Sequence, residues 1–387
     1  MAALGRKLRM GMVGGGPGAF IGDVHRKAAQ FDQNVELVAG AFSRDPAKSA
    51  AMAGALFLDP ARCYASYEEM ADKEKARPDG VDFVTIVTPN VSHFAIAKRF
   101  LEVGYHVVCD KPVTYTFEQA LELREIVKKS GKIFAVTYGY TGYPMVKLAR
   151  DMVRQGMLGE IVKVQAQYPQ GWLLEAEEAG QQSLNSWRID PAVSGKAGAM
   201  GDIGTHAAHL AEYVTGLRMA AVCAQLGSLN PQRPLDDDGN CLLKFSNGAC
   251  GMLWASQVSI GELNALAIKV FGRKGSLEWR QEYPTDLHHY TPDGVIHPYR
   301  RGTPAVAKIS PAAAAATRLP FGHPEALYES FATIYKNVTG AIRAGLEGRQ
   351  PTEIELDFPT IEDGLGGMAF IDAVVASKGA WRDFPKY

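Results

Sequence analysis

The chain has 387 residues, 47% of them hydrophobic, and its 41 lysines and arginines almost balance its 42 aspartates and glutamates. This length can hold two domains with substantial cores. The balanced charge excludes the basic surface that nucleic acids or anionic membranes require, and no apolar run approaches the roughly 18 residues of a membrane span. We therefore expect a cytoplasmic globular protein with neither kind of partner.

Apolar runs alternate with helical patterns through residues 8–138. We predict strands at 8–13, 35–42, 81–87, 105–110 and 132–138. Strand, short loop and helix repeating in this order are typical of a parallel sheet with helices on both faces. The predicted fold class is therefore α/β, and in such sheets ligands bind at the carboxyl ends of the strands.

The loop after the first predicted strand has the glycine pattern Gly14-x-Gly16-x-x-Ala19. Glycines at this point let the backbone turn sharply and approach a pyrophosphate at a helix N-terminus. The pattern alone would also suit an ordinary glycine-rich turn, but directly after the first strand of a βαβ unit it predicts dinucleotide binding.

The second predicted strand ends in Ser43 and Arg44. An acidic residue there would bind the 2′-hydroxyl of NAD, whereas a guanidinium can pair with the 2′-phosphate of NADP. Arg44 could equally be a solvated turn residue. The pair favours NADP and leaves NAD open.

The pattern changes at about residue 142, where short strand-like segments replace the alternation. We predict strands at 161–168, 222–229, 241–246, 249–260, 265–272 and 276–281, an irregular excursion at 298–322, and helices within 324–345 and 357–379. The strands predict a large, mostly antiparallel sheet in a second α+β domain. The predicted domains are 1–141 and 142–387, and the C-terminal helices could pack back on the first.

The stretch MGDIGTHAAHL, residues 200–210, carries an acid and an imidazole four residues apart, Asp202 and His206. In an α-helix the two side chains would lie on one face, one turn apart. Locally, the pair is either a proton-transfer couple or a helix ion pair.

Five motifs together resemble the glucose-fructose oxidoreductase, inositol dehydrogenase and rhizopine-catabolism (Gfo/Idh/MocA) family over nearly the whole chain. They are GGGPGAF (14–20), TPNVSHF (88–94), DKP (110–112), SWRIDP (186–191) and GKAGAMGDIGTH (195–206). The resemblance implies a Rossmann domain, an open-faced second domain, and NAD(P)-dependent oxidation or reduction of a secondary alcohol of a sugar or cyclitol. The chain departs from the family at Asp110, where Glu is commoner, at Gly139 and at Lys196.

The resemblance assigns catalytic roles to Lys111, Asp202 and His206. Hydride leaves an alcohol carbon as its hydroxyl proton is removed, so a base and a positive charge are needed at that oxygen. His206 would be the base, because imidazoles titrate near neutral pH, and Asp202 would orient it or bind a neighbouring hydroxyl. Lys111 would contact both the reacting oxygen and the nicotinamide ribose.

Further residues complete the expected site. Cofactor contacts are expected from Gly14, Gly16, Ala19, Phe20, Ser43, Arg44, Thr88, Asn90, His93, Lys111, Trp187 and Arg188, and substrate contacts from Lys111, Arg188, Asp202, His206 and His323. Asn90 could instead cap a helix, and Tyr168 and Trp172 could line the pocket or belong to the core. His209 is expected to pack in a helix, and no metal site is predicted.

His323 ends the long excursion, immediately before a helix that Pro324 and Glu325 could start. Some relatives are similar in lending a residue from this region to a neighbouring subunit's site, and family members commonly assemble through the open sheet face of the second domain. We therefore expect a homotetramer in which His323 binds substrate in its own or an adjacent protomer, although it could also be a solvated loop residue. Two alternative functions remain: a glycosidase that oxidises its sugar transiently with tightly held NAD, and a non-catalytic cofactor-binding sensor.

Overall fold

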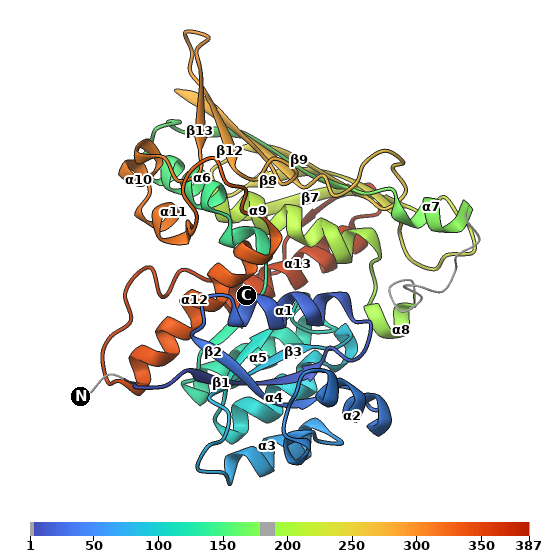
Figure 1. The fold of residues 1–387 in the computed structure, drawn as a ribbon. Coiled ribbons are helices and arrows are strands. Elements are labelled where there is room, and N and C mark those ends of the chain that lie inside the picture. The colour runs from blue at the N-terminus through green and yellow to red at the C-terminus, as the bar shows by residue number, and fades with distance from the viewer. Residues whose placement is uncertain (1–3, 179–189, 387) are drawn as a thin grey trace. The chain divides into compact units, whose positions relative to one another are not determined.

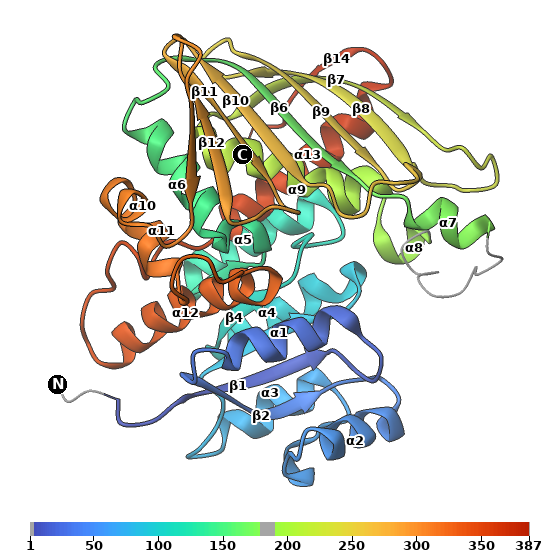
Figure 2. The same ribbon diagram turned by 45° about the horizontal axis from the view of Figure 1, so that its top comes forward.

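The computed structural model describes residues 4–178 and 190–386 (Figures 1 and 2). They form two compact units. The first comprises the chain up to Gly142 together with Leu327–Leu365, and the second comprises Tyr143–Ala326 together with the chain from Gly366 onward. No helix in the described residues combines the length and apolar character needed to cross a membrane. The predicted fold class is confirmed, since a parallel sheet is followed by a mostly antiparallel one.

The first unit is built on a five-stranded parallel sheet of order β2-β1-β3-β4-β5. Its strands are β1 (Leu8–Gly14), β2 (Val35–Ala41), β3 (Phe83–Val87), β4 (His106–Cys109) and β5 (Phe134–Val136). Its helices are α1 (Phe20–Gln30), α2 (Pro46–Ala55), α3 (Tyr67–Lys75), α4 (His93–Val103), α5 (Phe117–Ser130) and α12 (Leu327–Leu346). All five predicted strands are present, although most are shorter than predicted.

Local sequence signals set the helix ends in this unit. Asp45 accepts hydrogen bonds from the N–H groups of Ala47 and Lys48, so it caps α2 as its position before Pro46 predicts. Helix α5 begins with a capping box between Thr116 and Gln119. It ends at Gly131, whose φ of 62° is the left-handed conformation that glycine adopts without strain.

Helix α12 completes the first unit although it lies far along the chain. It packs against α1, and Phe331 and Tyr335 join the apolar core of the parallel sheet. The Tyr335 hydroxyl lies 2.7 Å from Nδ1 of the fully buried His25 and 3.1 Å from the hydroxyl of Thr85 in β3. Burial lowers the pKa of His25 to about 4, so the ring is neutral at physiological pH.

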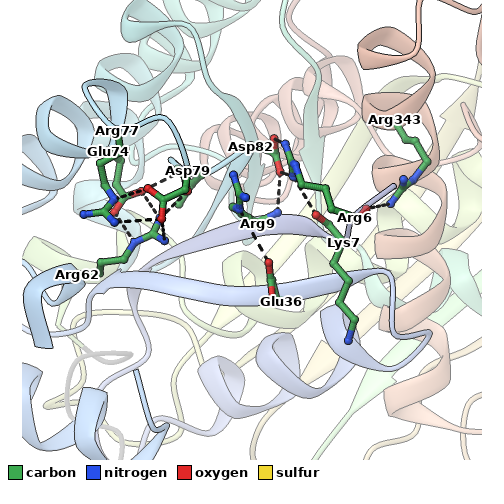
Figure 3. Close-up of polar contacts among 11 residues, drawn as sticks. Arg6, Lys7, Arg9, Glu36, Arg62, Glu74, Arg77, Asp79, Asp82 and Arg343 are labelled. Atoms are coloured by element: carbon green, nitrogen blue, oxygen red, sulfur yellow. Dashed lines mark hydrogen bonds and ion pairs between the residues drawn. The ribbon is translucent and has the colours of Figure 1, made fainter. Parts of the chain in front are cut away.

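Charged groups tie together the amino-terminal side of the sheet (Figure 3). Arg6 donates to both carboxylate oxygens of Asp82, at 2.7 and 2.8 Å, and the backbone N–H of Arg9 in β1 donates to the same carboxylate at 2.7 Å. Beside them, Glu74 of α3 accepts from the Arg62 guanidinium, at 2.9 Å from Nε, and from the Tyr64 hydroxyl at 2.7 Å. Because these contacts lie at the amino ends of the strands, they do not occupy the carboxyl ends, where functional groups are expected.

The second unit contains a nine-stranded sheet of order β13-β12-β11-β10-β6-β9-β8-β7-β14. The strands are β6 (Ile161–Pro169), β7 (Met219–Gly227), β8 (Asp238–Phe245), β9 (Cys250–Ser256), β10 (Ala267–Gly272), β11 (Gly275–Arg280), β12 (Asp286–Tyr290), β13 (Ile296–Arg300) and β14 (Trp381–Asp383). All neighbouring strands are antiparallel except β6 and β9. The helices are α6 (Pro144–Arg154), α7 (Trp172–Glu178), α8 (Pro191–Ser194), α9 (Thr205–Thr215), α10 (Pro304–Ile309) and α11 (Pro311–Ala316), and α13 (Ile361–Ser377) begins in the first unit and continues into the second.

One face of this sheet is covered by helices that include α6 and α9, and in Figure 2 no helix of the described residues lies on the other. Alternation along β8 and β9 directs Leu242 and Met252, which are paired across the strands, to the open face. Trp381 of β14 lies on the same face, with the Lys244 ammonium 4.5 Å from its ring centre. The open face is therefore partly apolar.

Two predictions for residues 298–325 are wrong. The segment 298–322 is not irregular, since it contains the end of β13 and the short helices α10 and α11. Pro324 and Glu325 do not start a helix, because α12 begins at Leu327. The Glu325 carboxylate instead points inward, where it accepts from the buried Arg301 guanidinium at 2.7 Å and from the backbone N–H groups of residues 318 and 319.

We predict that Glu74→Gln destabilises the protein by about 3 kcal/mol, because it removes the buried charge that pairs with Arg62 and leaves only the partly exposed Asp79 carboxylate, 3.6 Å away. The side chains of Arg62 and Glu74 are only 7% and 0% exposed. The matched control is Glu69→Gln in the same helix, which removes a solvent-exposed pair with Lys73 and should cost less than about 0.5 kcal/mol. Denaturant unfolding measures both values, and equal costs would contradict the structural importance given to the buried pair.

Candidate active site

The glycine loop after β1 has the geometry that a bound dinucleotide requires. Gly14 has a φ of +87°, and a Cβ there would lie 2.8 Å from the Thr88 side chain and 2.9 Å from the Val87 carbonyl oxygen. A Cβ on Gly16 would lie 3.0 Å from the Phe42 carbonyl oxygen. Larger residues would therefore push the loop away from the ends of β2 and β3, where the cofactor is expected.

The N-terminus of α1 is suited to a pyrophosphate. Ala19 is the N-cap residue and its side chain makes no capping hydrogen bond, so the first N–H groups of the helix lack a side-chain cap. Phe20, the first helical residue, is exposed. Sequence reasoning missed Arg26. This buried side chain donates to the Gly15 carbonyl oxygen at 2.8 Å and so helps to fix the glycine loop.

The residues expected to select the cofactor follow β2. Arg44 is exposed and Ser43 is half-buried. The Ser43 hydroxyl accepts from the backbone N–H of Asp45 at 3.1 Å, while the Asp45 carboxylate is engaged with the first turn of α2. The Arg44 guanidinium is therefore an exposed positive charge in this turn, whereas the Asp45 carboxylate is engaged as the helix cap.

Lys111 is half-buried and is separated from the end of β4 by Asp110. A cis peptide bond joins it to Pro112. The Asp110 carboxylate accepts from the backbone N–H of Lys111 at 2.8 Å and from the Thr137 hydroxyl at 3.0 Å. The shorter acid in place of Glu thus folds back on the lysine's own backbone. Thr137, which lies just past β5, had no signal in the sequence.

The segment after β3 carries Thr88 and Asn90 and leads to His93, the first residue of α4. Ser92 donates to the Thr88 hydroxyl at 2.8 Å, and Asn90 begins a short 3-10 turn, Asn90–Ser92, before α4. His93 does not fit the predicted ribose contact, because its side chain is 1% exposed and both ring nitrogens face backbone carbonyl oxygens. The carbonyl oxygens belong to Pro112 and Thr88, each 2.7 Å away.

In the second unit, Asp202 lies in a π-helical turn, Met200–Gly204, that leads into α9. His206 is the second residue of α9. The expected regular α-helix is therefore corrected to a π-turn followed by an α-helix, which changes the angular offset between the two side chains. Such π-turns occur frequently at functional sites. Gly204 closes the turn at a crowded point, since a Cβ there would lie 2.6 Å from the Met200 sulfur.

Residues far along the chain hold Asp202 and border His206. The buried amide of Gln257, just past β9, donates to the Asp202 carboxylate at 3.0 Å. Tyr168 at the end of β6 lies edge-on to the His206 ring, with centres 5.7 Å apart, and its hydroxyl donates to Asn264 at 2.7 Å. Burial raises the pKa of Tyr168 to about 12, so the phenol keeps its proton at neutral pH. Sequence reasoning missed Gln257 and Asn264.

The glycine-rich stretch before Asp202 is fastened by Asp236. Its carboxylate accepts from the backbone N–H groups of Gly198 and Met200 at 2.7 and 2.8 Å, and burial raises its pKa. A Cβ at Gly198 would lie 2.0 Å from the Asp236 carbonyl oxygen, so only glycine fits. Lys196, which departs from the family pattern, forms an ion pair with Asp372 of α13.

Trp187, Arg188 and His323 are the remaining expected site residues. Trp187 and Arg188 lie outside the described residues. His323 lies on an exposed part of the chain between α11 and α12, where its backbone carbonyl accepts from the Arg301 guanidinium. His209 is buried and stacks on Tyr213, as expected of a packing residue of α9.

Comparison with known proteins agrees with this architecture. Residues 8–138 match the oxidoreductase family model with an NAD-binding Rossmann fold, and residues 146–278 match the model of the GFO/IDH/MocA C-terminal domain. The uncharacterized oxidoreductase YfiI of Bacillus subtilis is 33% identical over 389 residues, covering 98% of both chains. Levoglucosan dehydrogenase of Pseudarthrobacter phenanthrenivorans is 30% identical over 54% of this chain and 58% of its own length.

Among solved structures, an inositol dehydrogenase homologue from Azotobacter vinelandii in complex with NAD⁺ superposes with a TM-score of 0.93. It is 36% identical, and the match covers 98% of each chain. A structure of an inositol dehydrogenase homologue from the same organism, in complex with NADH and myo-inositol, is 35% identical with a TM-score of 0.90.

Proposed function

Because the chain belongs to the Gfo/Idh/MocA family of NAD-binding oxidoreductases, we propose that it transfers hydride between NAD(P) and a secondary alcohol or ketone of a sugar, glycoside or inositol. The observation that carries the proposal is the π-turn that bears Asp202 and leads directly to His206 in α9, with Asp202 held by Gln257. The relatives that act on levoglucosan or bind myo-inositol support this substrate class.

Each reacting group has one task. In alcohol oxidation His206 accepts the hydroxyl proton, and Asp202, fixed by the Gln257 amide, binds a neighbouring hydroxyl or orients the imidazole. Lys111 donates to the substrate oxygen and stabilises the charge that develops there. The bound nicotinamide supplies the hydride acceptor in oxidation and the hydride donor in reduction. Arg188 and Trp187 are proposed to contact substrate and cofactor.

NADP is the proposed preferred cofactor. The glycine loop and the uncapped N-terminus of α1 suit the pyrophosphate of either dinucleotide. Arg44 is exposed beside Ser43, and the neighbouring Asp45 carboxylate caps α2 through its Oδ1. Relatives include a protein solved with NAD⁺, so the preference rests on this turn alone.

We further propose a homotetramer that covers the open face of the second unit's sheet. Leu242 and Met252 are 50% and 47% exposed on that face, and apolar surface of this kind favours association. His323 is proposed to hydrogen-bond substrate hydroxyls in its own or an adjacent protomer.

The reaction is tested by screening sugars, glycosides and inositols with both cofactors and following absorbance of the reduced nicotinamide. With the best substrate, Lys111→Ala and His206→Ala should each lower turnover on the order of 100-fold while cofactor affinity stays within a few-fold. Lys98→Ala, which removes an exposed lysine of α4, is the control and should be silent. Sugar release at constant NAD(P)H would indicate the glycosidase instead, and near-normal turnover of either variant would remove its residue from the mechanism.

Cofactor choice is tested at the turn after β2. Arg44→Ala should weaken NADP at least about 10-fold more than NAD, because it removes the phosphate's counter-ion. Ser43→Asp should shift preference further toward NAD by repelling the 2′-phosphate. Dissociation constants from cofactor fluorescence measure both effects. A wild-type protein that binds NAD far more tightly than NADP would overturn the proposed preference.

The tetramer is tested by Leu242→Glu, which places a charge in the covered face and should yield smaller species in sedimentation velocity. Leu346→Glu is the matched control, since Leu346 is similarly exposed, at 48%, on α12 of the other unit. If His323 serves a neighbouring protomer, Leu242→Glu and His323→Ala should both raise KM more than they lower kcat. A wild-type monomer, or an unchanged KM for His323→Ala, would exclude the corresponding proposal.

A further inference from the structure

His93 occupies an unusual position between two backbone carbonyl oxygens. It is the first residue of α4 and its side chain is buried. Its Nδ1 lies 2.7 Å from the carbonyl oxygen of Pro112, and its Nε2 lies 2.7 Å from that of Thr88. Both neighbours can only accept hydrogen bonds, so the ring is placed as a donor on two sides.

The protonation state of the His93 ring determines how many of these contacts are hydrogen bonds. A neutral imidazole has one N–H, whereas the imidazolium has two. Burial, the largest effect, lowers the pKa of His93, and Lys111 lowers it as well, while the two carbonyls and Asp110 raise it. In either form the ring donates to at least one carbonyl at short distance.

The two carbonyls belong to segments with different tasks. Pro112 directly follows Lys111, and Thr88 follows β3 beside the glycine loop, where its side chain borders Gly14. The backbone before Lys111 is already fixed, because the N–H of Asp110 donates to Ile86 in β3 and the N–H of Lys111 donates to the Asp110 carboxylate. After Lys111, the backbone is held by the His93 ring of α4, which contacts the Pro112 carbonyl oxygen.

We infer that His93 is a positioning residue: its ring ties the segment after Lys111 to the loop after β3, and thereby sets where the lysine amine lies relative to the bound dinucleotide. The inference rests on the proposed catalytic role of Lys111. Because its ring is buried and both ring nitrogens face backbone carbonyls, His93 acts through the backbone it holds. Displacing a catalytic group by about 1 Å can cost on the order of 100-fold in rate.

The test is His93→Phe, which keeps a ring but donates no hydrogen bond. Turnover should fall at least about 10-fold, with a cofactor dissociation constant within about threefold of wild type. His93→Gln, whose amide can donate to at least one of the carbonyls, should recover most of the loss. The matched control is His106→Phe at the amino end of β4, where the ring accepts from the Ile133 N–H at 2.9 Å, and its turnover should be unchanged.

A double-mutant cycle separates positioning from general loss of structure. If His93 acts only through Lys111, then His93→Phe should have no further effect on turnover in a Lys111→Ala background. A further loss of equal size there, or wild-type turnover of His93→Phe, would overturn the inference. Should the Phe variant not fold, His93→Leu, which also donates no hydrogen bond, takes its place in the cycle, where its loss must vanish in the same background.

Failure of the underlying proposal gives a different result. If Lys111→Ala alone keeps normal turnover, then the catalytic role of Lys111 is wrong, whatever the His93 variants do. If Lys111→Ala is impaired and His93→Phe is not, only the positioning role of His93 is lost.

Discussion

The parallel alignment of β1, β3 and β4 is the constraint on which the cofactor-binding half depends. Parallel strands end at the same edge of their sheet, so the glycine loop, Thr88 and Lys111 meet there although they are far apart in sequence. The ion pairs of Arg6 and Glu74 occupy the opposite side, where they hold the strands without competing with the ligand. The stabilising ion pairs and the residues proposed to bind the cofactor thereby lie at opposite ends of the strands.

The features that sequence could predict are those encoded by neighbouring residues. The buried strands of the first unit are continuous apolar runs, and Asp45-Pro46 and Gly131 are local signals for a helix start and a helix end. The family and its fold followed from short motifs at fixed spacing, and the comparisons confirm both. The roles of Lys111, Asp202 and His206 remain predictions.

The features that sequence could not predict depend on partners far along the chain. Strands β12 and β13 are rich in histidine, tyrosine and arginine and lie at a sheet edge, so they lack an apolar run. Glu325 looked like a first-turn residue of a helix because nothing local revealed its ion pair with Arg301. Likewise His93 was expected to contact the cofactor, because the backbone carbonyls of Pro112 and Thr88 face it only in the folded chain.

The placement of α12 has a consequence for how the protein is made. The first unit needs Phe331 and Tyr335 in its core, and the N–H of Val136 in β5 donates to the Pro359 carbonyl oxygen. Residues 143–326, which belong to the other unit, leave the ribosome between these two parts. The dinucleotide-binding unit therefore cannot complete its core until residues 143–326 have been synthesised. During that interval its apolar surface is incomplete and can be bound by chaperones.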